Sequence, residues 1–372
     1  MRKNILTVAF VYLILIVTYR FLLPFGDEAD YVVRVSMLNA LEKFNFYSLF
    51  ISDINTNFCV NNSMVITDIY PDIDYKFCDE GLYQIIARIF VTYLIFSPIF
   101  VVLILISYIA KNKEFKQRSY VLLLSLLFPG LLYYTSVVSL EQITLMLSML
   151  IVLFLESYII ASILLPLILY IDTGNGVIVL VFLAFNYLLS IISNRYVKNI
   201  KIIVILYLIF IYFANLLVLE LATSIPYLSG IASAEYEYYG IGEGNYVYSN
   251  YPLLGRPIIT FLSSVFMTPW FVYSLTAFAI FIYMLYTAIV KAKSYYKLSE
   301  ITTTEVNLLA TILTVFTCVF MLPGHANAKY YIFMFPIFIV WLIKMIGLKK
   351  VYKYIILLNL TVISKLFLIN IL

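Results

Sequence analysis

Long apolar runs that recur from one end of the chain to the other constrain its fold more than any other sequence feature. A stretch of about 20 predominantly apolar residues is long enough to cross a bilayer as an α-helix. Of the 372 residues, 64% are hydrophobic and only 12% are charged, whereas soluble domains carry about 25% charged residues. The charged side chains are too few to cover a water-facing surface. This excludes a cytosolic enzyme, a disordered chain and a nucleic-acid-binding protein.

The hydropathy pattern predicts an all-α polytopic membrane protein with about eleven transmembrane helices. We expect one integral-membrane domain over residues 1–372, without a separate soluble domain. The eighth apolar stretch is too long for one straight crossing, and we expect Pro269 and Trp270 to divide it into an interfacial segment and a span. The expected spans are 4–23, 86–110, 119–138, 139–155, 157–171, 177–193, 202–222, 257–290, 304–322, 330–346 and 354–372.

Basic residues predict the orientation, because Lys and Arg are retained on the cytoplasmic side of a membrane. With a cytoplasmic N-terminus, all inner connections except the one between the fourth and fifth spans are basic. The basic clusters lie at 2–3, 111–118, 195–201, 291–297 and 349–353. The two largest outer segments, 24–85 and 223–256, are acidic instead, and we expect the first of them to be partly helical.

The three cysteines fall into two groups. Cys59 and Cys78 both lie in the first outer loop, where disulfides persist, so they either form a disulfide or remain as two free thiols. A disulfide there would stabilise the protein by about 3 kcal/mol in the chain-entropy model. Cys318 lies within an expected span and is interpreted as a packing residue.

An acidic cluster directly follows the first span, with Asp27, Glu28 and Asp30 in four residues and Arg34 behind them. A carboxylate at the outer membrane surface could act as a general base for a sugar hydroxyl. Asp27 and Glu28 could also bind a divalent cation such as Mg²⁺ or Mn²⁺ beside a phosphate leaving group. Alternatively, the acids stabilise the N-terminus of a helix expected over 28–43.

Two further acids lie at expected outer ends of spans. Glu141 follows the segment Pro129-Gly130 to Ser139 and could contact a sugar hydroxyl, or it could cap a helix after Ser139. Asp172 lies in the turn Asp-Thr-Gly-Asn-Gly and is a candidate substrate contact. Because Asp and Gly are ordinary turn residues, the sequence favours a structural role for Asp172.

A short outer loop carries the chain's only histidine, His325, with Lys329 and Tyr330 following it. On a helical turn His325 and Lys329 would share one face and could bind a phosphate or pyrophosphate. Arg256, at the outer mouth of the eighth span, is the other candidate anion contact. The alternatives are a lysine that snorkels beside a tyrosine belt and an arginine that anchors the helix at the interface.

These motifs, in this order, resemble the GT-C superfamily of polytopic glycosyltransferases, which use polyprenyl-phosphate-linked sugars. Asp27-Glu28 is similar to the acidic motif after the first span, and Pro129 to Glu141 looks like its Pro-x-Tyr-Ser…Glu segment. The run from His325 to Pro336 is similar to the His-Lys-Glu-x-Arg-Phe…Pro pattern of some mannosyltransferases. It departs from that pattern by Ala326-Asn327 in place of Lys-Glu and by Lys329 in place of Arg.

The resemblance implies a bacterial surface-polysaccharide enzyme of the inner membrane with an extracytoplasmic active site. Asp27 would be the base, and Glu28 would orient the acceptor or a metal ion. His325, Lys329 and Arg256 would hold the phosphate of the donor, and the anomeric carbon would invert. The partners would be a polyprenyl-phosphate-linked sugar and a glycan or lipid-linked acceptor.

Three alternatives remain open at this level. An O-antigen or capsule polymerase would share the outer site and use a lipid-pyrophosphate-linked oligosaccharide. A polysaccharide transporter or flippase would favour charges deep within the spans and broken helices at the midplane, whereas the acids here cluster at one surface. A structural assembly subunit would carry out no chemistry at all.

Overall fold

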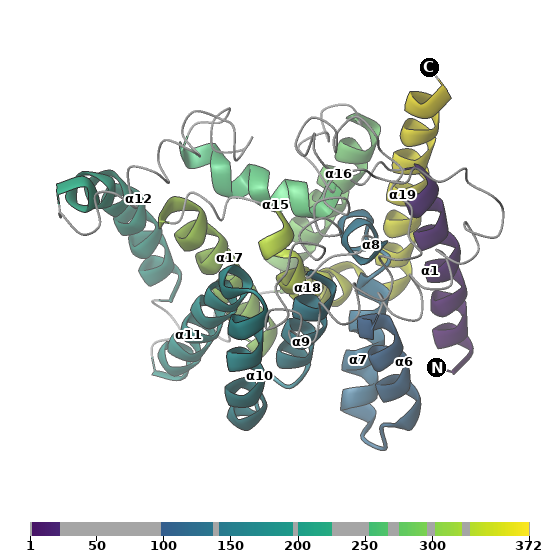
Figure 1. Cartoon of the computed structure of the whole chain (residues 1–372), viewed down its shortest axis with the longest axis horizontal. Helices are drawn as coiled ribbons and strands as arrows, with labels where there is room; N and C mark the ends of the chain where they lie inside the picture. The colour runs from purple at the N-terminus through teal and green to yellow at the C-terminus, as the bar shows by residue number, and fades with distance from the viewer. Residues whose placement is uncertain are drawn as a thin grey trace, which may run out of the picture. The chain divides into compact units, whose positions relative to one another are not determined.

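The computed structural model describes residues 2–22, 98–136, 141–195, 200–224, 253–266, 275–295, 302–321 and 328–371. Over these ranges the regular elements are all helical, as the sequence predicts (Figure 1). They are α1 (Arg2–Leu22), α6 (Pro98–Ile109), α7 (Lys113–Ser125), α8 (Pro129–Ser136), α9 (Glu141–Leu153), α10 (Tyr158–Ile171), α11 (Thr173–Arg195), α12 (Ile200–Ser224), η3 (Leu253–Gly255), α15 (Arg256–Phe266), α16 (Leu275–Tyr295), α17 (Thr303–Met321), η6 (Ala328–Tyr330), η7 (Ile332–Met334), α18 (Phe335–Ile346) and α19 (Leu348–Ile371).

Four of these helices contain apolar stretches long enough to cross a membrane. The stretches are Thr173–Ser193, Leu275–Ala292, Thr303–Met321 and Leu348–Leu368. Shorter apolar helices coincide with other expected spans, including Asn4–Tyr19, Tyr158–Ile171 and Ile202–Ala214. This is the architecture of a helical membrane protein, and the count of eleven crossings stays a prediction.

Two of the expected spans have a different local structure, and a third is divided as expected. The stretch 119–138 is divided, because α7 ends at Ser125 and α8 starts at Pro129, whose fixed φ suits the first turn of a helix. In 330–346 two 3₁₀ turns precede α18, whose 12 residues measure about 18 Å. The expected division of 257–290 is confirmed, since α15 and α16 are separate helices. Their connection, with Pro269 and Trp270, lies outside the described residues.

The chain divides into two compact units, and the first comprises Met1–Leu127, Leu132–Leu147 and Ile363–Leu372. Here α6 and α7 form a hairpin that packs against α1, where the Tyr12 and Phe100 rings stack at 4.0 Å. The Ser119 hydroxyl lies 2.9 Å from that of Ser107 and 2.7 Å from the Leu103 carbonyl oxygen. Asn112 caps α7 by accepting the Glu114 N–H at 2.8 Å. The basic segment expected as a loop is therefore largely the first turns of α7.

Helix α17 is the central element of the second unit, which comprises Phe128–Leu131 and Ser148–Val362. It packs against α11, α12, α15 and α18. The Asn186 side chain on α11 donates to the Asn307 side chain on α17 at 2.7 Å, and the Tyr207 hydroxyl on α12 lies 3.0 Å from that of Thr317. Cys318 is buried in α17 as a free thiol, which confirms its interpretation as a packing residue.

The start of α17 has one half of a capping box, in which Glu305 reaches back to Thr302. The Thr302 N–H donates to the Glu305 carboxylate at 2.5 Å, and the Lys344 ammonium of α18 donates to the Thr302 hydroxyl at 2.7 Å. The Glu305 side chain thereby satisfies the N–H of the residue that precedes the helix, and the Thr302 main-chain carbonyl accepts the Glu305 N–H at 2.9 Å. The lysine thereby ties the start of α17 to the end of α18.

An aromatic cluster fills the interior of the second unit around α18. Phe335 contacts Phe128 at 4.6 Å and Phe261 at 5.9 Å between ring centroids, and Phe338 contacts Phe261 at 5.3 Å. Such pairs add to the stabilisation that area burial alone provides. The cluster positions α15 over α18, and Figure 1 shows α15 running crosswise to α10 and α11.

The Tyr207–Thr317 contact is expected to be a measurable link between α12 and α17. Tyr207→Phe and Thr317→Val each remove one hydroxyl with little change of shape. Because polar contacts between membrane helices have coupling energies of about 0.6 kcal/mol on average, with a maximum near 1.7 kcal/mol, we expect a value in that range. Unfolding of the single and double variants by SDS in mixed micelles measures it, and additive effects would show that the contact does not form.

Candidate functional site

Several candidate residues lie outside the described ranges. They are Asp27, Glu28, Asp30, Arg34 and His325, together with Cys59 and Cys78. Glu141 is the first residue of α9. Within the described ranges, no group of three or more His, Cys, Asp and Glu side chains could hold a metal ion. The base, the metal site and the disulfide therefore stay predictions.

Asp172 caps α11 at the turn between α10 and α11. One carboxylate oxygen accepts the Asn175 main-chain N–H at 3.1 Å, and the other accepts the Asn175 side-chain amide at 2.7 Å. A Cβ on Gly176 would collide with Leu169, so glycine is what lets the two helices approach at this turn. The structural role that the sequence favours for Asp172 is the one observed, because an Asp at the N-cap satisfies free N–H groups.

Arg256 begins α15 and is half-buried. Steps of four and seven residues along a helix return to the same face, which places Thr260 and Ser263 in line with Arg256. Both hydroxyl-bearing residues are buried. The Ser264 hydroxyl donates to the Phe261 carbonyl at 2.6 Å, whereas the Ser263 hydroxyl has no hydrogen-bond partner in the described part of the chain. Thus α15 turns a polar face with one unsatisfied hydroxyl toward the protein interior.

Lys329 and Tyr330 lie in η6, where the lysine Nζ is 5.4 Å from the centroid of the Tyr330 ring. This is a cation–π contact. The turn η6 packs against both α15 and α11. The structure therefore brings together the elements that carry Arg256 and Lys329, although the two residues lie 73 positions apart in sequence.

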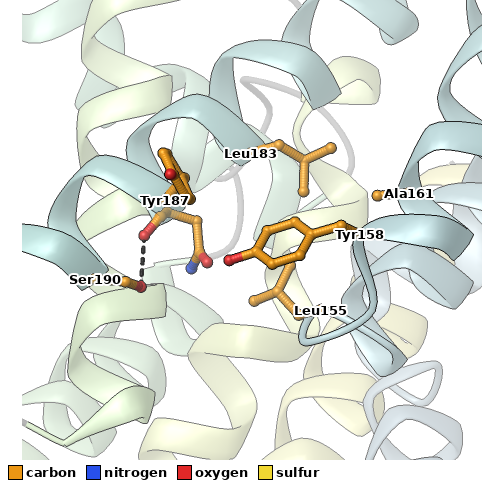
Figure 2. Close-up of a pocket in the computed structure, with 7 residues that line it drawn as sticks. Leu155, Tyr158, Ala161, Leu183, Tyr187 and Ser190 are labelled. Atoms are coloured by element: carbon orange, nitrogen blue, oxygen red, sulfur yellow. Dashed lines mark hydrogen bonds between the residues drawn. The ribbon is translucent and has the colours of Figure 1, made fainter.

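A pocket of about 490 Å³ lies on the hairpin of α10 and α11 (Figure 2). Its lining residues are Leu155, Tyr158, Ala161, Leu183, Asn186, Tyr187 and Ser190. It lies near the first residues of α10, at the opposite end of that helix from Asp172. None of these residues belongs to a motif recognised in the sequence. The signal that could have found them is the grouping of Asn186, Tyr187 and Ser190 on an otherwise apolar span.

The described residues thus contain two places that could bind a ligand. The first is the polar face of α15 beside η6, which carries two cations and a buried hydroxyl and suits an anionic ligand. The second is the apolar pocket of α10 and α11. In comparisons with known proteins, no family model, no curated protein and no solved structure matches this chain.

Proposed function

We propose that the chain is a membrane glycosyltransferase that transfers a sugar from a polyprenyl-phosphate-linked donor to a glycan or lipid-linked acceptor. The observation that carries the proposal is the joint order of three polar motifs in a chain with few charges. These are Asp27-Glu28 after the first span, the segment 129–141, and His325 with Lys329 and Tyr330. All three are expected on the extracytoplasmic face of a bacterial inner membrane.

In the proposed reaction, the Asp27 carboxylate takes the proton of the acceptor hydroxyl, and the oxygen of that hydroxyl attacks the anomeric carbon of the donor sugar. The bond from that carbon to the donor phosphate breaks, and the lipid phosphate leaves with inversion at the carbon. A base positioned in this way accelerates a reaction by about 10²–10⁴-fold. Glu28 orients the acceptor or a divalent cation. The other proposed substrate contacts are Asp30, Arg34, Glu141 and Tyr330.

Packing of α15 against η6 supports the phosphate-binding part of this proposal. Arg256 and Lys329 lie on these two elements, and charge-assisted hydrogen bonds from such cations hold phosphate groups strongly. His325 precedes η6 in sequence and would complete the set. Asp172 has no place in it, because both of its carboxylate oxygens bond to Asn175.

The experiment that tests the function is mass spectrometry of surface glycans from a strain that lacks the protein. The glycosyltransferase hypothesis predicts the loss of one defined linkage with normal chain length. An O-antigen or capsule polymerase, which would share the outer location, predicts single-repeat glycans instead. Unchanged glycans in the deletion strain would contradict both.

Purified protein separates the enzyme from a polysaccharide transporter or flippase. An enzyme consumes lipid-linked sugar and releases polyprenyl phosphate in detergent, where no membrane gradient exists. The expected result is a labelled acceptor and an equal amount of released lipid phosphate. Transport of intact lipid-linked sugar in sealed vesicles, without any consumption, would exclude the enzyme.

The buried Ser263 hydroxyl gives a prediction for the polar face of α15. Ser263→Ala is expected to leave the free energy of unfolding unchanged or raise it by about 1 kcal/mol, because an unsatisfied hydroxyl is removed. If the hydroxyl bonds to the donor, KM for the donor rises about 3- to 10-fold, the equivalent of one hydrogen bond. Donor titrations in detergent measure KM.

The matched control is the neighbouring Ser264→Ala. It removes the hydrogen bond to the Phe261 carbonyl, so it is expected to lower the free energy of unfolding by about 1 kcal/mol and leave KM unchanged. A KM for Ser263→Ala equal to that of the unmodified protein would show that this hydroxyl does not reach the donor.

A further inference from the structure

The turn between α6 and α7 carries a basic surface whose side chains the structure describes, and its chemistry is independent of the proposed transferase reaction. Four cations lie within eight residues, namely Lys111, Lys113, Lys116 and Arg118. Lys111 and Lys113 are exposed, and Lys116 is half-buried. These three lysines are called the lysine patch below. The patch lies within the first compact unit, at the tip of the α6–α7 hairpin (Figure 1).

The positive charge of this turn is not balanced by neighbouring acids. Glu114 is the acidic residue of the turn, and its carboxylate already accepts a hydrogen bond from the Arg118 guanidinium at 2.6 Å. Within the described part of the chain, no lysine of the patch forms an ion pair. With four cations and one carboxylate, the turn has a net charge of +3. The lysine patch therefore suits an anionic partner.

Helix α6 indicates the level of the patch in the bilayer. Val101, Leu105 and Ile109 lie on one face of the helix, because steps of four residues return to the same face, and they are 39%, 50% and 72% exposed. In a helical membrane protein such an exposed apolar stripe lies in hydrocarbon. Helix α6 ends at Ile109, and the exposed Lys111 follows two positions later. The patch therefore lies where the hydrocarbon meets the lipid headgroups.

A second basic cluster, at the start of α19, offers a comparison. Lys349, Lys350 and Lys353 are exposed like the lysines of the patch. The apolar side chains around them differ, however, because those between positions 348 and 359 are buried or half-buried. The tip of the α6–α7 hairpin combines uncompensated positive charge with an exposed apolar stripe, and the start of α19 has only the charge. This combination matches a molecule with a phosphate at one end and acyl chains at the other.

We propose that the tip of the α6–α7 hairpin binds an anionic glycerophospholipid. Clusters of four or more Lys and Arg directly beside a membrane helix attract anionic headgroups, and the same charge predicts that this end faces the cytoplasmic leaflet. The phosphate lies among Lys111, Lys113 and Lys116, and one acyl chain lies along Leu105 and Ile109. The bound lipid holds the hairpin tip at the membrane surface and takes no part in sugar transfer.

Native mass spectrometry of the full chain, delipidated in detergent, tests the proposal. We expect dioleoylphosphatidylglycerol to bind about tenfold more tightly than dioleoylphosphatidylcholine. The triple variant Lys111→Gln/Lys113→Gln/Lys116→Gln is expected to lose this preference and to bind phosphatidylcholine as the unmodified protein does. The variant Lys111→Arg/Lys113→Arg/Lys116→Arg keeps the charge and is expected to keep the preference.

The matched control removes the same number of lysines from the other cluster. Lys349→Gln/Lys350→Gln/Lys353→Gln lowers the net charge of the chain equally but leaves the lysine patch intact. Its affinity for phosphatidylglycerol is expected to equal that of the unmodified protein. An equal loss of affinity in the two glutamine variants would overturn the proposal, because binding would then follow the total charge of the protein rather than this surface.

Two further outcomes would overturn the proposal. Equal retention of the two lipids would assign the patch to an acidic protein segment instead. Displacement of phosphatidylglycerol by millimolar glycerol phosphate at constant ionic strength would show that the apolar stripe plays no part. If the glutamine variant of the patch does not fold, Gln117→Glu decides the question. It keeps every lysine but adds a carboxylate one turn after Lys113, so it is expected to weaken phosphatidylglycerol binding by about threefold or more, and an unchanged affinity would refute the site.

Discussion

Asp27→Asn is expected to reduce transfer of the donor sugar by about 10²–10⁴-fold, because an amide cannot accept the proton of the acceptor hydroxyl. The side chain keeps its size, so the amount of protein in the membrane should not change. The measurement is the initial rate at saturating donor with purified protein. Surface glycans of a strain with this variant should lose the same linkage as the deletion strain.

Two further variants test whether the effect is specific to the Asp27 carboxylate. Glu114→Gln removes an exposed carboxylate that bonds to Arg118 at 2.6 Å in the first turns of α7. Because exposed ion pairs contribute little, its transfer rate should equal that of the unmodified chain. Glu28→Gln should raise the KM for the acceptor, or the concentration of divalent cation needed for transfer, more than it lowers the transfer rate at saturating substrate. A fully active Asp27→Asn variant would refute the assignment of the base.

Gly130→Ala is expected to lower the free energy of unfolding by about 3 kcal/mol or more. A Cβ at this position would collide with the main-chain carbonyl of Ser264 on α15. Overpacking a core typically costs about 1–3 kcal/mol, and here the obstacle is backbone, which cannot rotate away as a side chain can. The helix propensity that Ala gains over Gly, about 1 kcal/mol, does not offset the collision.

The matched control for Gly130→Ala is Gly347→Ala at the junction of α18 and α19. Gly347 has φ of 85°, and no atom lies within 4 Å of the position that a Cβ would occupy. Its substitution tests backbone strain without collision and should cost about 1–2 kcal/mol. SDS titration in mixed micelles measures both variants. A Gly130→Ala protein as stable as the Gly347→Ala protein would show that Gly130 does not lie against the Ser264 carbonyl as described.

Local sequence signals predicted the parts of the fold that depend on neighbouring residues. Hydropathy identifies helices such as α10, α11 and α17, because each needs only a run of apolar side chains. The expected division of 257–290 and the turn at Asp172 were also predictable, since proline and Asx side chains act on their own backbone. The break between α7 and α8 was missed, although Pro129 stands there, because the apolar run continues through it.

What only the tertiary structure decided depends on residues far apart in sequence. Asn186 meets Asn307 across 121 positions, and Gly130 meets the Ser264 carbonyl. The inward polar face of α15, its packing on η6 and the pocket of α10 and α11 also follow from how helices pack. Apolar periodicity identifies a helix but not its partner, because many pairings bury similar surface. By itself, therefore, the sequence determined a helical membrane protein with a scarce set of polar motifs. The packing decided which of those motifs became neighbours.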